Sequence, residues 1–272
     1  MFPKTNLHTH TIFCDGKLTA VEMVKAAIDK NLEVIGFSGH AHMNGIGQEW
    51  CMSPEDTAAY KATAASLARQ YADQIEVVLG IEQDVFSDLP TGDYQYVIGA
   101  AHFVEKNGEY LPIDHSEELF ADGVNRIYQG DIYAFARDFY ETEVLAAKKT
   151  NADIIAHFDL FKKFNSGKKF FDDDDKRYRD AALEALLEVA KTGAIFEINT
   201  GAAYRGYNAE FYPAPFLLKE LKNVGGRITF SSDSHDARSL CFAFPAARKI
   251  ARECGFKSAW TWKDGGFKEF KI

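Results

Sequence analysis

The sequence lacks the features that mark secreted and membrane-spanning proteins. Its four cysteines, Cys14, Cys51, Cys241 and Cys254, are scattered without Cys-x-x-Cys spacing. This distribution argues against a disulfide framework and a zinc knuckle, and it suits the reducing cytoplasm. The first residues show no signal-peptide pattern, and no apolar run is long enough to cross a bilayer. We therefore expect a cytoplasmic protein without a membrane partner.

Basic residues are also scarce. The chain has 31 lysines and arginines against 40 acidic residues, a formal net charge of −9. A nucleic acid polymer is not expected as a partner, because backbone phosphates require a basic surface. A small phosphorylated substrate remains compatible with this charge, since several divalent cations would make a pocket locally positive.

The chain has no Pro/Gly/Ser-rich linker, and short β-rich runs alternate with amphipathic helical patterns from start to end. We predict strands at 6–10, 34–40, 75–82, 96–102, 152–157, 194–199 and 227–233, with a short terminal strand at 258–262. We predict helices at 20–31, 54–71, 117–150 with a break near Gly130, 178–192, 213–224 and 245–254.

Seven strand–helix units in series favour one closed α/β barrel over two domains, so residues 1–272 are expected to form a single domain. The alternative is a doubly wound open sheet. No Gly-rich nucleotide fingerprint follows the first strand, which weakens that alternative.

His8 and His10 lie on the first predicted strand. Residues two apart on a strand point the same way, so the two imidazoles would form half of a transition-metal site. The pair alone is weak evidence, because His-x-His recurs by chance.

Further metal-ligand residues follow the other predicted strands. Six of the eight histidines and three carboxylates lie at strand ends or in the loops after them, where α/β barrels build their active face. These candidates are His8, His10, Asp15, His40, Glu82, His102, His157, Asp233 and His235.

Nine candidates exceed the four ligands of one tetrahedral zinc ion. They suit two or three closely spaced divalent ions with one bridging carboxylate. Such sites generate hydroxide from bound water near neutral pH and clamp an oxyanion. Hydrolysis, most naturally of a phosphate ester, is the reaction class that this set indicates.

At these residues the chain resembles the PHP (polymerase and histidinol phosphatase) phosphoesterases, and among them the histidinol-phosphatase branch. The resemblance covers nearly the whole chain and implies a distorted (β/α)7 barrel. The matching segments are His8-Thr-His10, Phe13-Cys-Asp-Gly16, Ser38-Gly-His-Ala-His42, Gly80-Ile-Glu82, Gly99-Ala-Ala-His102, the strand ending at His157, and Ser232-Asp-Ser-His235.

The resemblance implies three divalent metal ions. His8, His10, Glu82 and Asp233 would hold the first. Glu82 would bridge to the second, completed by His102 and His157. Asp15, His40 and His235 would hold the third. Many family members have histidine where Asp15 stands, whereas the histidinol-phosphatase branch often has aspartate. Zinc, manganese and iron all suit such ligands.

The implied reaction is hydrolysis of L-histidinol phosphate to L-histidinol and phosphate, in histidine biosynthesis, by attack of a metal-bridging hydroxide. Two further residues are candidates for contacting the substrate. His42 would hydrogen-bond the phosphate or protonate the leaving alkoxide. Arg205 stands in the loop where histidinol-phosphatase relatives are expected to carry a phosphate-binding arginine.

Two other functions remain open. One is a PHP phosphatase or phosphodiesterase acting on another small phosphate ester, such as a nucleotide. The other is a metal-binding module without turnover, which the full ligand set disfavours. The sequence does not indicate an oligomeric state.

Three features have no assigned role. Cys14 lies beside Asp15, and His115 matches no ligand position. The acidic run Asp172–Asp175 is interpreted as a solvated loop before a helix. The lysine pairs at 162–163 and 168–169 would offset its charge or reach a phosphate.

Overall fold

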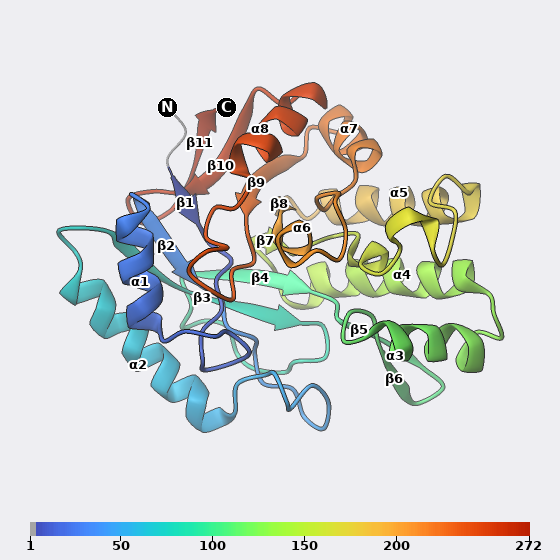
Figure 1. The fold of residues 1–272 in the computed structure, drawn as a ribbon, viewed down its shortest axis with the longest axis horizontal. Coiled ribbons are helices and arrows are strands. Elements are labelled where there is room, and N and C mark those ends of the chain that lie inside the picture. Colours follow the sequence, from blue (N-terminus) through green and yellow to red (C-terminus); the bar gives the residue numbers. More distant parts are fainter. Residues whose placement is uncertain (1–3) are drawn as a thin grey trace.

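The computed structural model describes residues 4–272, and within that range seven strands form one parallel sheet curved into a barrel (Figure 1). Their order in space, β1-β2-β3-β4-β7-β8-β9, follows their order in the sequence. The strands are β1 Thr5–Asn6, β2 Val34–Phe37, β3 Glu76–Asp84, β4 Tyr96–Ala100, β7 Ile154–Ile155, β8 Ile195–Asn199 and β9 Arg227–Ser231.

The first and last strands of the sheet meet, which closes the barrel. A parallel bridge pairs Thr9 with Ser234 just beyond β1 and β9. The Ser234 amide donates to the His8 carbonyl at 3.0 Å, and the His10 amide donates to the Ser234 carbonyl at 2.8 Å. The predicted α/β barrel is therefore confirmed. The doubly wound alternative is wrong, because the strand order never reverses.

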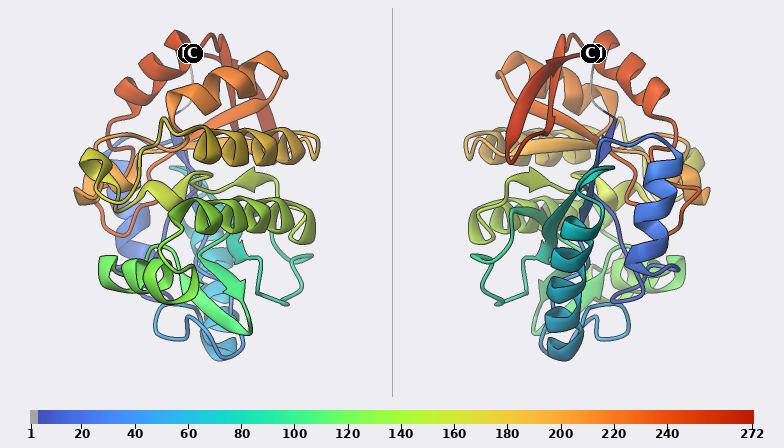
Figure 2. Two further views of the ribbon diagram at one scale, coloured as in Figure 1. Left: turned by 90° about the vertical axis from the view of Figure 1, so that its right-hand side faces the viewer. Right: turned by 90° about the vertical axis from the view of Figure 1, so that its left-hand side faces the viewer.

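Helices surround the barrel, with α4 and α5 side by side on one flank and α1 and α2 on another (Figures 1 and 2). The α-helices are α1 Ala20–Asp29, α2 Pro54–Gln70, α3 Glu117–Asp122, α4 Ile132–Lys149, α5 Lys176–Ala190, α6 Gly201–Arg205, α7 Pro215–Asn223 and α8 Phe244–Glu253. Shorter turns of helix occupy Gly123–Ile127, Leu160–Lys162 and Ser166–Lys168. No helix in residues 4–272 has the length and apolar character needed to span a membrane.

Local sequence explains where several helices begin. Thr19 and Glu22 form a capping box at the start of α1, and Ser53 and Asp56 form another at α2, where Pro54 takes the first position. Asp175 caps α5 by accepting a hydrogen bond from the Arg177 amide. The last residue of the acidic run is thus a helix cap, as the interpretation of a loop before a helix predicts.

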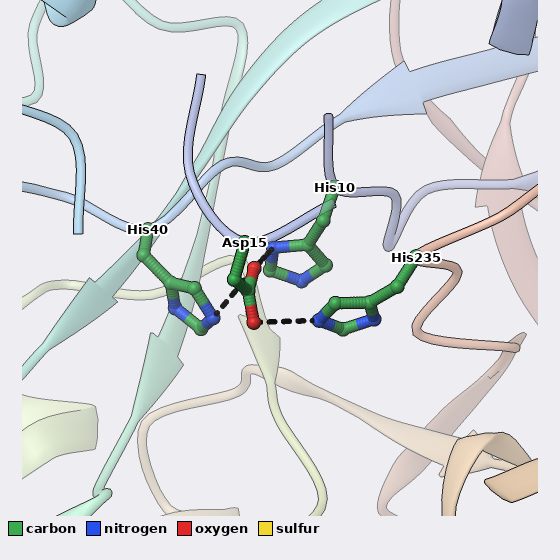
Figure 3. Close-up of side chains that lie close together, drawn as sticks. All are labelled: His10, Asp15, His40 and His235. Atoms are coloured by element: carbon green, nitrogen blue, oxygen red, sulfur yellow. Dashed lines mark hydrogen bonds and ion pairs between the residues drawn. The ribbon is translucent and has the colours of Figure 1, made fainter. Parts of the chain in front are cut away.

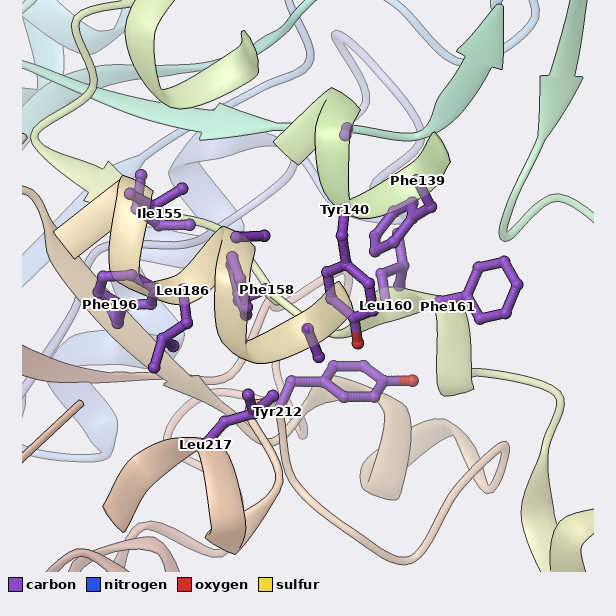
Figure 4. Close-up of a cluster of buried hydrophobic side chains, with 14 of the residues drawn as sticks. Phe139, Tyr140, Ile155, Phe158, Leu160, Phe161, Leu186, Phe196, Tyr212 and Leu217 are labelled. Carbon is purple, nitrogen blue, oxygen red and sulfur yellow. The ribbon is translucent and has the colours of Figure 1, made fainter. Parts of the chain in front are cut away.

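A large apolar core lies between the barrel and the helices α4, α5 and α7 (Figure 4). Phe158 and Phe196 come from the barrel side and meet Leu186 of α5 and Leu217 of α7 there, all four fully buried or nearly so. Burial of such side chains favours folding by roughly 1.5–3 kcal/mol each. This packing holds the strands, and hence the loops that follow them, in fixed positions.

Tyr96 fills the barrel interior, and two glycines make room for it. A Cβ atom at Gly36 would lie 2.4 Å from the Tyr96 hydroxyl, and one at Gly80 would lie 2.1 Å from Cζ of the ring. The hydroxyl donates to the Phe37 carbonyl at 3.0 Å. Any larger side chain at either glycine would displace this ring, so both positions require glycine.

A C-terminal hairpin closes the amino-terminal end of the barrel. It comprises β10 Ser258–Trp262 and β11 Phe267–Lys271. The Trp262 indole N–H donates to Glu76 at the start of β3, 2.7 Å away, and the ring packs against the barrel interior. At the opposite end, where the strands finish, side chains of the loops line the opening of the barrel.

The structure differs from the sequence prediction in several places, among them the short strand β7 and the unpredicted helix α6. The first two strands end at Asn6 and Phe37, earlier than predicted, although the chain continues extended and the Ser38 amide still donates to the Thr9 carbonyl. A hairpin of β5 Phe103–Lys106 and β6 Glu109–Pro112 was not predicted, and neither was β11. These short pieces lie outside the barrel and carry no strong alternation of apolar residues.

Candidate metal centre

His8 and His10 lie just beyond β1, where the chain is extended and its side chains reach the carboxyl end of the barrel. Both side chains are fully buried. The side-chain amide of Asn6 donates to the His8 carbonyl and to the Thr9 hydroxyl, both at 2.9 Å, which fixes this segment. The two imidazole rings lie 5.1 Å apart. The sequence prediction that this pair shares one site agrees with this placement.

Glu82, near the end of β3, lies at the middle of the histidines. Its Oε2 atom is 3.1 Å from Nε2 of His8 and 3.3 Å from Nε2 of His10. Its Oε1 atom is 3.2 Å from Nε2 of His157 and 3.5 Å from Nε2 of His102. The two carboxylate oxygens thus face two different sets of imidazoles, which suits a bridging ligand.

Asp15 is the centre of a second group of side chains (Figure 3). Its Oδ2 atom lies 3.0 Å from Nε2 of His235. Its Oδ1 atom lies 3.4 Å from Nδ1 of His10 and 3.7 Å from Nε2 of His40. His40 links the two groups, because its Nδ1 atom is 3.1 Å from Oε2 of Glu82.

Asp233, after β9, completes the cluster. Its Oδ1 atom lies 3.3 Å from Nε2 of His10 and 3.5 Å from Nδ1 of His235. Its backbone has φ +46°, in the left-handed region that non-glycine residues seldom adopt. The structure therefore brings all nine predicted candidates to one place, and it holds one of them in an uncommon backbone conformation, as functional sites often do.

Burial and the neighbouring carboxylates give the ligand imidazoles different pKa values. Burial lowers the pKa of His8, but the carboxylates of Glu197 and Glu82 outweigh it and hold that pKa well above its usual value. Burial likewise opposes protonation of His102, but its hydrogen bond with Asp84 raises the pKa to about 9, so a metal ion would have to displace protons from these two rings.

Burial lowers the pKa of His40 to about 3, although Glu82 opposes the shift, so this imidazole is neutral. Burial would raise the pKa of Glu82, but the imidazole of His8 and the hydrogen bond with His157 outweigh it and hold that pKa well below its usual value. The carboxylate is ionised at neutral pH.

Two buried carboxylates outside the predicted set orient the histidines. Oε2 of Glu197 lies 2.9 Å from Nδ1 of His8, and Oδ2 of Asp84 lies 3.1 Å from Nδ1 of His102. A metal-binding histidine usually has such a partner on its second nitrogen, which leaves the other nitrogen free for the ion. The sequence analysis missed both residues. The signal was present: Asp84 lies two positions after Glu82, and Glu197 is an acid within an apolar strand.

The donor set fits divalent transition-metal ions. Imidazole nitrogens and carboxylate oxygens converge, and Nε2 of His10 is buried in the cluster without a hydrogen-bond partner among residues 4–272. Cys14 contacts the other nitrogen of this ring, with Sγ 3.4 Å from Nδ1. Burial raises the pKa of the Cys14 thiol to about 12, so it is a neutral neighbour of His10 rather than a thiolate ligand.

The cluster forms the floor of an open cleft of about 400 Å³. Two cations reach the cleft. Arg205 at the end of α6 lies 2.9 Å from Oδ2 of Asp233, and Lys163 lies 3.1 Å from Oδ2 of Asp114. Other lining residues are Glu49, Trp50, Phe103, Pro112, His115, Leu160 and Tyr207.

The structure does not bring His42 into this cleft. Its Nδ1 atom is 3.1 Å from the Met52 carbonyl, and His42 is not among the residues that line the cleft. His115, which matched no ligand position in the sequence, lines the mouth of the cleft. Lys168 lies at hydrogen-bond distance from Asp172 and Asp174, so it offsets the charge of the acidic run, whereas Lys163 faces the site.

Comparison with known proteins gives one family. The family model described as PHP domain matches residues 6–201. A Deinococcus radiodurans protein named "Probable histidinol-phosphatase" is 32% identical over 259 residues, covering 91% of this chain and 92% of that protein.

Two solved structures share the fold. A structure from Listeria monocytogenes aligns with a TM-score of 0.78 at 20% identity, over 89% of this chain and 99% of that one. The histidinol phosphate phosphatase of Lactococcus lactis, complexed with zinc, L-histidinol and phosphate, aligns with a TM-score of 0.67 at 21% identity, over 97% of this chain and 98% of that one.

Proposed function

The chain belongs to the PHP domain family, and on this premise we propose that it is a metal-dependent phosphomonoesterase that hydrolyses L-histidinol phosphate to L-histidinol and phosphate. The observation that carries the proposal is the position of Glu82, whose two oxygens face separate sets of buried imidazoles. Relatives named histidinol-phosphatase over most of the chain support the choice of substrate.

Three divalent ions, with zinc the first choice, would occupy the cluster. His8, His10, Glu82 and Asp233 would hold one, Glu82, His102 and His157 a second, and Asp15, His40 and His235 a third. The zinc in the Lactococcus lactis structure supports this choice of metal. When bound, such ions lower the pKa of coordinated water and stabilise negative charge on phosphate oxygens.

The protein itself would position the phosphate. Arg205 lies at the edge of the cluster with its Nη2 atom fixed by Asp233, and Nη1 donates to the Asp233 carbonyl at 3.1 Å. Lys163 approaches the same cleft from the loop after β7. Two cations beside the metal-ligand cluster would bind the phosphate oxygens and stabilise the charge that develops on them during hydrolysis.

The proposal extends to the whole chain and to its cellular role. Asp233 and His235 lie beyond the residues that the family model matches, and the last barrel strand ends beside them, so we assign all of residues 1–272 to one PHP domain. We place the reaction in histidine biosynthesis, in the cytoplasm. The four cysteines are free thiols, which supports a reducing compartment.

A phosphate-release assay on zinc-reconstituted protein tests the function. We expect kcat/KM for L-histidinol phosphate to exceed that for nucleoside monophosphates by about 100-fold or more, because the leaving groups differ in polar contacts as well as in size. Glu82→Ala should remove activity and bound metal together, while the exposed Glu184→Gln should change neither. Near-native turnover by a fully metallated Glu82→Ala variant, or equal turnover of nucleotides, would contradict the proposal.

A further inference from the structure

We propose that Glu49, at the mouth of the cleft, determines specificity by binding the positively charged end of the substrate. The enzyme would thereby select phosphate monoesters of amino alcohols over phosphate monoesters with neutral or anionic leaving groups. This inference rests on the proposed phosphatase function and adds a second recognition point to it.

The cleft has two chemically different ends. Its floor is the histidine and carboxylate cluster, where a phosphate would bind beside Arg205 and Lys163. Its mouth is formed by two loops that approach each other, one with Glu49 after β2 and one with His115 after β6. A substrate with its phosphate at the floor therefore extends its leaving group toward Glu49.

Charge pairing leaves Glu49 available for a ligand. Asp114 lies 3.1 Å from Lys163, and Asp233 lies 2.9 Å from Arg205. The basic side chain nearest to Glu49 in the described residues is His115, whose Nδ1 atom lies 3.7 Å from Oε1, which is longer than a hydrogen bond. Its side chain is 61% exposed. Among the lining carboxylates in the described part of the chain, Glu49 is the one without a partner at hydrogen-bond distance.

Trp50 connects the two ends. Its ring lies edge-on to His40, with centroids 4.5 Å apart, and stacks with Phe103 at 6.0 Å and an interplanar angle of 12°. It thus forms an aromatic wall between the cluster and Glu49. An aromatic ring next to a carboxylate is a favourable site for an organic cation, because the π face and the negative charge both attract it.

This pairing defines the substrate class. A monoester with an ammonium or imidazolium group on its leaving group, such as L-histidinol phosphate, would have a partner at each end of the cleft. A monoester with a neutral aromatic leaving group would lose the contact with Glu49. One with a carboxylate on its leaving group would be repelled.

The test compares three substrates: L-histidinol phosphate, p-nitrophenyl phosphate and 3-phosphoglycerate. We expect Glu49→Gln to lower kcat/KM for L-histidinol phosphate about tenfold, mainly through KM, as for one partly exposed charged hydrogen bond. It should change kcat/KM for p-nitrophenyl phosphate less than about twofold. Glu49→Lys should lower activity on L-histidinol phosphate further and raise activity on 3-phosphoglycerate. Glu55→Gln, an exposed change on α2 outside the cleft, is the matched control.

Equal effects of Glu49→Gln on all three substrates would overturn the inference, even if the protein proves to be a phosphatase. A binding measurement tests the role of Glu49 independently of the proposed phosphatase function.

Titration of the zinc-loaded protein with L-histidinol, which has no phosphate to hydrolyse, should show about tenfold weaker binding to Glu49→Gln than to the unaltered protein. Weaker binding supports a cation site at Glu49 whether or not the protein hydrolyses L-histidinol phosphate. Unchanged binding overturns the inference.

Discussion

Nδ1 of His8 lies 2.9 Å from Oε2 of Glu197, and both side chains are completely buried. Glu197 also accepts hydrogen bonds from the His157 amide at 2.7 Å and from the Ser231 hydroxyl at 2.7 Å. One carboxylate thus connects three strands of the barrel and sets the orientation of the His8 ring. This contact directs Nε2 of His8 toward Glu82, where the metal-ligand cluster lies.

Glu197→Gln should weaken metal binding without unfolding the protein. Glutamine keeps the size of the side chain but removes the negative charge that stabilises the Nδ1–H tautomer of His8. We expect zinc affinity to fall about 10- to 100-fold, as for other partners of metal-binding histidines. Zinc titration against a competing chelator measures this, with Glu184→Gln as the exposed control. Unchanged affinity would mean that Glu197 only supports the fold.

Arg205→Met should weaken phosphate binding more than binding of L-histidinol. The guanidinium lies at the edge of the cluster, and removing a charged hydrogen-bond donor to phosphate should raise KM for L-histidinol phosphate about 10- to 100-fold. The inhibition constant of inorganic phosphate should rise in parallel. The affinity for L-histidinol should change less than about twofold, because removing the Arg205 charge has little effect on the binding of an exposed ammonium group at the other end of the cleft. Arg69→Met, an exposed change on α2, serves as control. Parallel losses for both ligands would assign Arg205 a structural role.

Removal of metal should destabilise the fold as well as abolish activity. The site brings carboxylates and imidazoles together, and an ion that binds only the folded state stabilises it by about 2.7 kcal/mol at 100 times its Kd. For a chain of this size that corresponds to a loss in Tm of about 5–10 °C after chelation. Thermal unfolding before and after chelation, and after return of zinc, measures it. An unchanged Tm would count against tight binding to the cluster.

The positions of the metal-ligand candidates could be predicted because they depend on simple geometry. His40, Glu82, His102 and His157 each follow or end a strand of a parallel barrel, and such ends meet on one face whatever the details of packing. The strand count also followed from alternation of apolar runs. These features need only the approximate location of each element, and errors of a few residues in strand bounds did not matter.

Side-chain direction after a strand ends could not be predicted. His40 and His42 lie two apart, and an extended chain would point both into the site. The strand ends at Phe37, however, and His42 contacts the Met52 carbonyl instead. Glu197 is an acid within an apolar strand and Lys163 belongs to a lysine pair, but the sequence does not show which side chain each one contacts, because both contacts depend on tertiary packing. The β5–β6 hairpin that positions His115 likewise depends on contacts with the rest of the fold.

Glu143 gives a prediction for the dependence of stability on pH. It lies on α4 with 1% exposure, and neither carboxylate oxygen has a hydrogen-bond partner within residues 4–272. Burial, and then the carboxylates of Asp84 and Asp159, raises the pKa of Glu143 well above its ordinary value of 4.5. The folded protein therefore keeps a proton there that the unfolded chain releases.

The sign of the effect follows from this difference. Below pH 4.5 the Glu143 carboxyl is protonated in both the folded and the unfolded protein, so its ionisation does not change the free energy of unfolding. As pH rises from 4.5 toward the folded-state pKa, the free energy of unfolding falls by up to about 1.4 kcal/mol per pH unit. Glu143→Gln lacks this group, so its stability advantage over the unaltered protein should grow by at least about 1 kcal/mol between pH 5 and pH 8. Urea unfolding at both pH values and one zinc concentration measures the difference.

Glu141→Gln, exposed on the same helix, is the control, and its difference in stability from the unaltered protein should not grow with pH. A constant difference for Glu143→Gln would mean that the buried carboxyl ionises at its ordinary pKa.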